Sequence, residues 1–337
     1  MTKHKAFRPR SLRSAFSELG DSTPLGHLIF DTAEEWYCAK HPPFSGDEIS
    51  LVNSIRVAQC PFCHSASFRK DGKREDGTQR YLCLRCKRRF NPLTGSLFDS
   101  RKIPISEWIE FLVHLFQYES VSVSSLDNRN SPSTGRYWMK KVFEVLRHYQ
   151  DETVLGDRFW IDETYLRKTP SKTSKDAEGR KLRGLSHDKF CVATATDGRK
   201  AVLLVIGYGK PSSARILKAM SPHIKPSSTM VDDKEKAHGA LADSLGLVRE
   251  PYASAELKGV DDGHNPMNEI NTVHRLFKRF MSRHGSYDRS ELQPWCNLFA
   301  FILDHHGNVA EMVRDFLELA ISTRKTIRFR DAMKKKP

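Results

Sequence analysis

The chain has 337 residues and a formal net charge of +14. Its length allows two or three domains, and its charge favours a polyanionic partner, either nucleic acid or an acidic membrane surface. No apolar run approaches the roughly 20 residues of a membrane span, and the basic N-terminus lacks the apolar segment of a secretory signal. We therefore expect a cytoplasmic protein, and the scattered Cys38, Cys191 and Cys296 suit a reducing compartment better than a disulfide framework.

Residues 54–100 are predicted to form a small module held by a metal ion. Two Cys-x-x-Cys pairs, Cys60 with Cys63 and Cys83 with Cys86, are separated by nineteen residues. A two-residue spacer lets both thiolates of a pair reach one ion from a tight turn, and two pairs complete a tetrahedral sulfur shell around Zn²⁺. Because so small a module has little apolar core, the metal would supply its folding energy.

Two other uses of these cysteines compete with zinc. The run Cys60-Pro-Phe-Cys63-His64 has the Cys-x-x-Cys-His pattern of c-type haem attachment. Haem attachment needs no second pair, however, and follows export, for which we find no signal. A thioredoxin-like redox role is disfavoured because neither pair lies at a strand-to-helix turn of a βαβ pattern.

The same module is strongly basic. From Arg69 to Lys102 there are eleven Lys or Arg against four Asp or Glu. This charge predicts contact with DNA phosphates, although a purely structural zinc staple is compatible with the same sequence. The candidate DNA-binding cations around the second cysteine pair are Arg85, Lys87, Arg88 and Arg89.

Residues 101–150 are predicted to be helical. Apolar residues at helical spacing indicate a helix over 105–112, a short helix over 120–126 and a third that begins at Ser133. A short helix, a turn and a longer basic helix is the order of a helix-turn-helix. In that interpretation Arg136 and Lys140 contact DNA. Any three-helix bundle would look similar, with Trp138, Val142 and Phe143 as its core.

From Arg158 the pattern changes to strands alternating with helices, which predicts an α/β mixed sheet. Asp197-Gly198 is a hairpin dipeptide between two apolar runs. The predicted strands span 159–162, 190–195, 201–206, 229–231 and 247–252, and the predicted helices span 213–220 and 236–245.

Two of these predicted strands end in acidic residues, one at Asp162 and the other at Asp232-Asp233. Carboxylates at strand ends converge where a sheet opens to solvent, a common place for catalytic residues. Such a pair is a hard-oxygen site for Mg²⁺, and two ions with phosphate oxygens support in-line displacement at phosphorus. The structural alternative is that these residues are turn formers or helix caps.

A helix predicted over 266–284 offers a third group. Asn271 and Lys278 are seven residues apart and share a face next to the apolar stripe, whereas Glu269 points about 180° away from Lys278. An Asn carbonyl is a legitimate Mg²⁺ ligand, and Lys278, with Arg275 near the same face, would contact a DNA phosphate. The alternative is an amphipathic helix whose polar residues are only solvated.

The order of these motifs over residues 55–305 resembles bacterial insertion-sequence transposases of the ribonuclease H-like superfamily. The segments that carry the resemblance are Trp-Ile-Asp-Glu-Thr-Tyr-Leu from residue 160, Met-Val-Asp-Asp-Lys-Glu-Lys-Ala-His from residue 230, and Asn-Glu-Ile-Asn-x6-Lys from residue 268. They are most similar to the branch in which a Lys follows the catalytic acids and Asn replaces the third. The resemblance makes Asp162 the first catalytic acid, Asp233 the second, Asn271 the third and Lys278 the following lysine. Asp233 matches the second acid better than Asp232 does, because it lies five residues before a position of aromatic type, which is occupied here by His238.

The resemblance implies a ribonuclease H-like mixed sheet preceded by a zinc ribbon and a small helix-turn-helix-like domain. It implies Mg²⁺-dependent cutting of transposon ends, with Mn²⁺ as a substitute, and joining of the 3′-hydroxyl to target DNA. The expected partner is double-stranded DNA, both the terminal inverted repeats and the target. Further copies of the chain would associate with it on DNA. The protein would be associated with the bacterial nucleoid. The rivals are a DNA-binding regulator with an inactive α/β domain and a structure-selective nuclease. The expected segments are 1–53, unassigned; 54–100, zinc ribbon; 101–150, DNA-binding bundle; 155–310, catalytic domain; and 311–337, a basic tail, helical or disordered.

Overall fold

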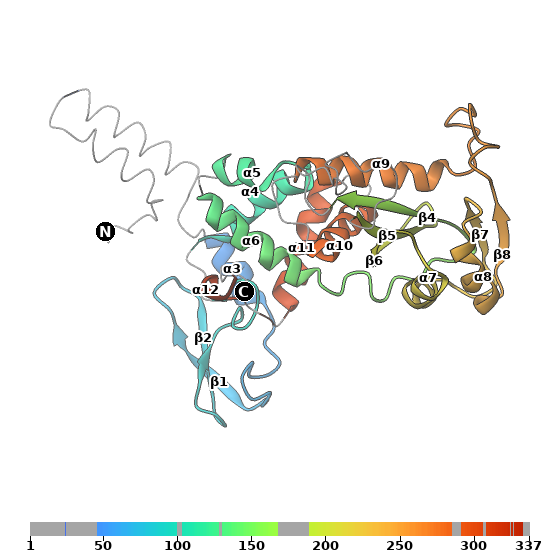
Figure 1. The fold of residues 1–337 in the computed structure, drawn as a ribbon. Helices are drawn as coiled ribbons and strands as arrows, with labels where there is room; N and C mark the ends of the chain where they lie inside the picture. Colours follow the sequence, from blue (N-terminus) through green and yellow to red (C-terminus); the bar gives the residue numbers. More distant parts are fainter. Residues whose placement is uncertain are drawn as a thin grey trace, which may run out of the picture. The chain divides into compact units, whose positions relative to one another are not determined.

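The computed structural model describes residue 24 and residues 46–99, 103–127, 130–167, 189–284, 291–305, 308–323, 325 and 327–332. Most of the unassigned N-terminal segment and the end of the basic tail therefore lie outside the described residues. The chain divides into two compact units, Met1–Val145 with Val309–Pro337, and Leu146–Asn308 (Figure 1). Within the described segments, no helix is both long and apolar enough to cross a bilayer.

The first unit contains a small antiparallel sheet in the order β1-β2-β3, formed by the cysteine-bearing segment. Its core consists of Cys60, Cys83 and three aromatic rings. The rings of Tyr81 and Phe90 stack with centroids 5.6 Å apart, and Phe68 meets both edge-on. The elements are α3 (Gly46–Ser54), β1 (Phe68–Lys73), β2 (Gln79–Cys83) and β3 (Arg89–Phe90).

The helices of the first unit include the three that the sequence predicts between 105 and 145. Trp108 of the first stacks on Trp138 of the third with ring centroids 4.1 Å apart, and both are buried. Gly135 allows the second and third helices to approach closely, because a Cβ there would lie 1.9 Å from Ser125 Oγ. The unit's helices are α4 (Ile105–Phe116), α5 (Val121–Asp127), α6 (Pro132–Val145), α11 (Val309–Ser322) and α12 (Phe329–Ala332).

The second unit is built on a five-stranded mixed sheet in the order β6-β5-β4-β7-β8. The first three strands of this sheet along the chain, β4, β5 and β6, form an antiparallel meander, and β7 and β8 run parallel to the central β4. This order, with the first strand in the middle, is that of the ribonuclease H-like fold and confirms the predicted fold class. The strands are β4 (Arg158–Arg167), β5 (Lys189–Thr196), β6 (Ala201–Tyr208), β7 (Thr229–Asp232) and β8 (Val248–Pro251).

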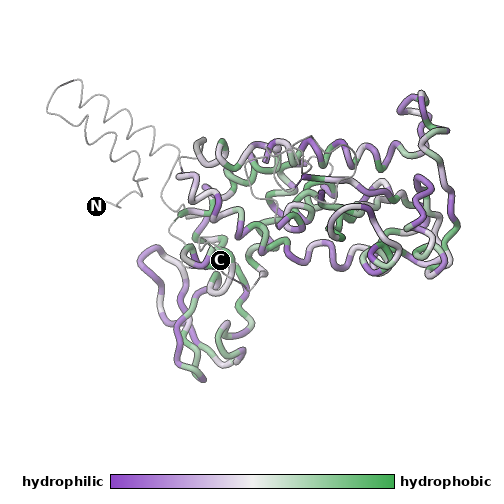
Figure 2. Tube along the Cα trace, viewed as in Figure 1, coloured by the Kyte–Doolittle hydropathy of each residue, from purple (hydrophilic) through white to green (hydrophobic). Residues whose placement is uncertain are grey.

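Helices cover both faces of this sheet (Figure 1). On one face, Phe159, Ile161 and Met230 pack in a core that includes residues of α7 and α8. On the other, Trp160 packs with Ile270 of α9, an amphipathic helix whose hydropathy alternates along its length (Figure 2). The helical elements are α7 (Ser213–Met220), η1 (Ser221–His223), η2 (Lys236–His238), α8 (Gly239–Leu245), α9 (Asn268–Arg283) and α10 (Leu292–Asp304).

One strand boundary corrects the sequence prediction. β4 does not end at Asp162 but continues to Arg167, paired with β5 up to Lys189. The apolar run ends at Ile161, but the long antiparallel partner holds the backbone extended beyond it. β7 does end near its acids, at Asp232. Asp162 therefore lies inside a strand, at the level where the neighbouring strand stops.

Candidate functional site

The pairing of β4 with β7 brings Asp162 and Asp233 next to each other. The two strands run parallel, and Trp160 pairs with Val231. Two residues further along each chain, Asp162 and Asp233 are at the same level and on the same face, because side chains alternate with period two and neighbouring strands lie about 4.8 Å apart. The negative charge of Asp233 contributes to raising the pKa of Asp162, as expected for close carboxylates.

Asp162 is an acid in an unfavourable environment for its charge. Burial first, and then the charges of Asp233 and Glu163, raise its pKa to about 7. One Oδ1 contact opposes this shift, since the backbone N–H of Glu163 donates to it at 2.7 Å. The side chain is 23% exposed, which leaves it open to a small ligand. A cation beside it would replace this unfavourable environment with a favourable one.

Asp233 is partly buried, and its Oδ1 accepts a hydrogen bond from the backbone N–H of Glu235 at 3.1 Å. Its neighbour Asp232 has a different environment. Asp232 is fully buried, and its Oδ2 lies 2.7 Å from a guanidinium nitrogen of Arg249. The strand alternation thus separates the two adjacent acids, one on the face that carries Asp162 and the other on the opposite face.

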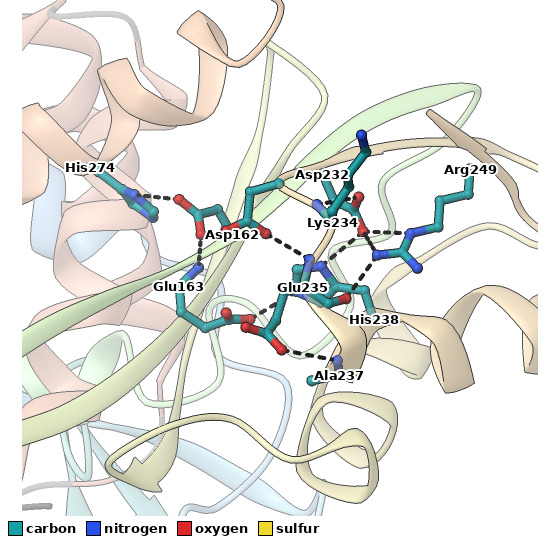
Figure 3. Close-up of polar contacts among 10 residues, drawn as sticks. Asp162, Glu163, Asp232, Lys234, Glu235, Ala237, His238, Arg249 and His274 are labelled. Atoms are coloured by element: carbon teal, nitrogen blue, oxygen red, sulfur yellow. Dashed lines mark hydrogen bonds and ion pairs between the residues drawn. The ribbon is translucent and has the colours of Figure 1, made fainter. Parts of the chain in front are cut away.

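On that opposite face, four charged side chains form a closed network (Figure 3). His238 Nδ1 lies 3.0 Å from Asp232 Oδ2, and its Nε2 lies 2.9 Å from Glu163 Oε1. Arg249 Nε donates to the same Asp232 oxygen at 2.8 Å. We call Glu163, Asp232, His238 and Arg249 the buried ion network. It links β4, β7, the η2 turn and β8 through side chains.

The pKa values in this network show that its charges are matched. Burial alone would lower the pKa of His238, but its bonds to Asp232 and Glu163 outweigh burial and raise it to about 10. Burial likewise opposes ionisation of Asp232, yet its bonds to His238 and Arg249 lower its pKa. At neutral pH the imidazolium is therefore charged and held between two carboxylates.

The third element of the site is the face of α9 that meets β4. His274 Nδ1 lies 3.6 Å from Asp162 Oδ2 (Figure 3). Asn271 and Lys278, the residues that the sequence proposes, lie about one turn before and after His274 on the same side and are exposed. Burial and then the positive charge of Lys278, four residues along the same helix, lower the pKa of His274 to about 3. The helix thus presents Asn271, His274 and Lys278 on the side of Asp162.

Glu269 lies elsewhere. Its Oε2 would be 3.9 Å from a Cβ built on Gly198, in the turn between β5 and β6. Helical geometry favours Asn271 over Glu269 as the third group of the site, and Glu269 lies beside the turn that joins β5 and β6. The same reasoning misses His274, although its spacing of three from Asn271 and four from Lys278 is the signal that could have found it.

In the first unit, the four predicted cysteines converge. Cys60 Sγ lies 3.7 Å from Cys86 Sγ, and Cys63 Sγ lies 3.6 Å from Cys83 Sγ. All four sulfur atoms lie within 4.8 Å of one another. Four thiolates around Zn²⁺ at about 2.3 Å would be roughly 3.8 Å apart, so the cluster is compatible with a zinc ribbon.

The two cysteine turns have matching backbones. The residue after each pair, His64 or Lys87, has φ of 57° and donates its N–H to the carbonyl of the first cysteine. The N–H of Cys86 donates to Cys83 Sγ and helps to lower the pKa of Cys83 to about 6, which favours the thiolate that binds metals.

The cations that the sequence assigns to DNA are all exposed. Arg89 pairs with Asp71 at 2.7 Å, and Arg275 pairs with Asp262 at 3.5 Å. Arg136 and Lys140 lie one turn apart on the outer side of α6, opposite the buried Trp138. The full set of exposed candidates is Arg85, Lys87, Arg88, Arg89, Arg136, Lys140 and Arg275.

These features define a class: a ribonuclease H-like sheet with two adjacent carboxylates at its centre, preceded in the chain by a tetracysteine module. No family model matches the chain. The chain is 25% identical over 249 residues to an uncharacterized protein in transposable element ISH50 of Halobacterium salinarum, covering 71% of this chain and 83% of that protein. It is thus similar to a protein of a mobile element.

Among solved structures, the catalytic domain of Mos1 mariner transposase matches with a TM-score of 0.29 and 13% identity, covering 57% of this chain and 95% of that one. The mariner Mos1 paired end complex with Mg matches with a TM-score of 0.27 and 14% identity, covering 65% of this chain and 79% of the other.

Proposed function

We propose that the chain is the DNA transposase of an insertion sequence, which cuts the ends of the element and joins the freed 3′-hydroxyl to target DNA. The observation that carries the proposal is the register that aligns Asp162 with Asp233 on one face of the sheet. Among the described residues, neither acid has a Lys or Arg ion-pair partner. The similarity to the ISH50 protein supports the same function.

Divalent cations fit this pair. Carboxylate oxygens are the ligands that Mg²⁺ and Mn²⁺ prefer. Burial and the neighbouring carboxylates of Asp233 and Glu163 raise the pKa of Asp162, and a bound cation would offset both effects. When bound, such cations would supply a Lewis acid on each side of the scissile phosphate. Asp162 and Asp233 would hold them, and Asn271 would complete the site from α9.

The chain's own residues would then orient the DNA. Lys278, exposed on the same side of α9, would bind a phosphate near the scissile bond, and Arg275 would add a second contact on the same helix. Strand transfer requires the two ends of the element to be handled together, so we infer self-association on DNA.

The first unit would recognise the terminal inverted repeats. Cys60, Cys63, Cys83 and Cys86 would hold Zn²⁺, and the neighbouring exposed cations would contact phosphates. Gly135 lets α6 pack closely on α5, and Arg136 and Lys140 are exposed on the outer side of α6. The recognition helix of a helix-turn-helix needs such exposed side chains. The double variant Arg136→Ala with Lys140→Ala should weaken end binding and lower the salt slope of log K by about two.

The decisive test uses purified protein, Mg²⁺ or Mn²⁺, and a supercoiled plasmid that carries the element's ends. We expect nicking at the ends and joining of the 3′-end to target DNA, both lost in Asp162→Asn and kept in Asp243→Asn, which changes an exposed acid of α8. Cleavage without joining would instead indicate a nuclease. Sequence-specific binding without cleavage in any divalent ion would indicate a regulator.

The zinc proposal has its own test. A chelator, or Cys60→Ser, should unfold residues 54–99 and leave the sheet of the second unit protected, because the ribbon's core is little more than three aromatic rings and its cysteines. Hydrogen exchange read by mass spectrometry would show the two regions separately. Retained protection of the ribbon after metal removal would contradict a zinc-dependent fold.

A further inference from the structure

His274 is the side chain of α9 that meets Asp162, and it makes no ordinary hydrogen bond. Its side chain is only 7% exposed. The distance of 3.6 Å from Nδ1 to Asp162 Oδ2 exceeds the usual hydrogen-bond range. Nε2 is buried and has no hydrogen-bond partner among the described residues. A buried imidazole with one nitrogen unpartnered and the other facing a carboxylate at 3.6 Å is costly, and an apolar side chain would avoid that cost.

Other buried histidines show what is particular to this one. His238 is bonded at both nitrogens, and His223 Nδ1 lies 2.9 Å from the carbonyl oxygen of Thr153. His284 resembles His274 in lacking partners, but it packs against the rings of Phe280 and Trp295. An unpartnered imidazole is therefore not by itself a site. His274 differs from His284 because a carboxylate without a cation faces it.

The spacing between His274 and Asp162 suits two ligands of one ion. Two atoms bound at about 2.1 Å are roughly 3.0 Å apart at a right angle and 3.4 Å apart at a tetrahedral angle. The observed 3.6 Å is close to this range.

We propose that His274 is a direct ligand of the divalent cation held by Asp162 and Asp233, and that it makes the site prefer Mn²⁺ over Mg²⁺. The inference rests on the proposed function, because it needs the carboxylate pair to bind an ion. The preference follows from the donor set, since Mg²⁺ favours oxygen ligands whereas imidazole nitrogen binds transition metals better. Asn271, exposed one turn earlier on α9, would then contribute less to metal affinity than His274 does.

The experiment measures metal binding by the zinc-loaded full-length protein without DNA. Free Mn²⁺ is followed by electron paramagnetic resonance, and Mg²⁺ binding by calorimetry. We expect His274→Leu to weaken Mn²⁺ binding by at least about tenfold, the lower end of the loss seen even for outer-shell partners of metal sites. Mg²⁺ binding should change much less. His284→Leu is the matched control, because it removes an equally unpartnered imidazole from the same helical region and should leave both affinities unchanged.

A second measurement tests the wild-type protein and so does not depend on whether a variant folds. In the wild-type protein loaded with Mn²⁺, pulsed electron paramagnetic resonance should detect the nitrogen of a directly bound imidazole. The signal should then disappear in His274→Leu but persist in His284→Leu and Asn271→Ala. Mn²⁺ bound without a nitrogen signal would overturn the proposal.

The outcomes also separate this inference from the proposed function. If Asp162→Asn abolishes metal binding while His274→Leu leaves it unchanged, the ligand role of His274 is wrong and the carboxylate site stands. If Asp162→Asn leaves metal binding unchanged, the carboxylate site itself is wrong, and this inference fails with it.

Discussion

The two faces of the central sheet treat acids from the same two strands in opposite ways. On one face, Glu163 and Asp232 are buried with His238 and Arg249, and their charges are matched within the protein. On the other, Asp162 and Asp233 lie side by side, and the pKa of Asp162 is raised to about 7. A shift of one residue along the strand separates the two environments.

The difference distinguishes acids that stabilise the fold, whose charges are matched within the protein, from acids whose charges are left for a ligand. The buried ion network joins four elements and leaves little charge unmatched. The pair on the opposite face adds repulsion rather than cohesion, so stability does not account for its presence. Substitutions on each face should therefore have opposite effects on stability and on activity.

Asp162→Asn should abolish metal-dependent DNA cleavage without weakening the fold. In the proposed metal site, loss of the Asp162 ligand would remove several kcal/mol of transition-state stabilisation, on the order of a 10³-fold loss of rate. The free energy of unfolding should stay the same or rise, because the substitution removes a charge that burial and Asp233 disfavour. Asp232→Asn should instead lower it. Urea denaturation and cleavage assays on both variants check the contrast, and a large loss of stability in Asp162→Asn would contradict it.

His238→Leu should destabilise the second unit by about 3–5 kcal/mol, because it leaves Glu163 buried without its imidazolium partner and removes one of the two cations that contact Asp232. The control is His264→Leu. That imidazole also pairs with an aspartate, Asp261, but it is 84% exposed, so its loss should be small. Urea unfolding followed by tryptophan fluorescence measures both. Equal effects of the two substitutions would mean that the buried ion network does not stabilise the sheet.

The stabilisation by His238 should depend on pH. Its pKa is raised from an ordinary 6.5 to about 10 in the folded protein, so its contribution is complete below pH 6.5 and is lost as pH rises toward 10. Between pH 6.5 and 9, the stability difference between the wild type and His238→Leu should shrink by roughly 3 kcal/mol. Denaturation of both proteins across this range isolates the histidine from other titrating groups. A constant difference would show that the ring is neutral.

Arg249→Gln should have the smallest effect, about 1–2 kcal/mol. The guanidinium is 27% exposed, so solvent screens its pair with Asp232, and Asp232 keeps its bond to His238. Thermal unfolding of this variant beside His238→Leu would rank the two cations. A larger loss of stability in Arg249→Gln than in His238→Leu would mean that Arg249 of β8, and not His238, contributes most to the buried ion network.

Local signals predicted much of this architecture. The cysteine spacing predicted a cluster, the apolar periods predicted the helices of both units, and the strand pattern predicted a mixed sheet. The extension of β4 beyond Asp162 was not predictable, because the pairing with β5 that holds it is set by a partner 22 or more residues away. The contact of His238 with Glu163 was not predictable either, and helical spacing could place His274 beside Asn271 and Lys278 but could not show its contact with Asp162. Both histidines contact residues of β4 that are distant in sequence. His238 is 75 residues from Glu163, and His274 is farther still from Asp162.

The unequal lengths of β4 and β7 have one more consequence. Their ladder is recorded only from Arg158 to Trp160, so at Asp162 and Asp233 two neighbouring strands are no longer joined by main-chain hydrogen bonds. An ion bound by both side chains would link the two strand ends where they are no longer paired. Cation binding should then slow amide exchange at the tips of both strands, because the bound ion would add a link where the main chain has none.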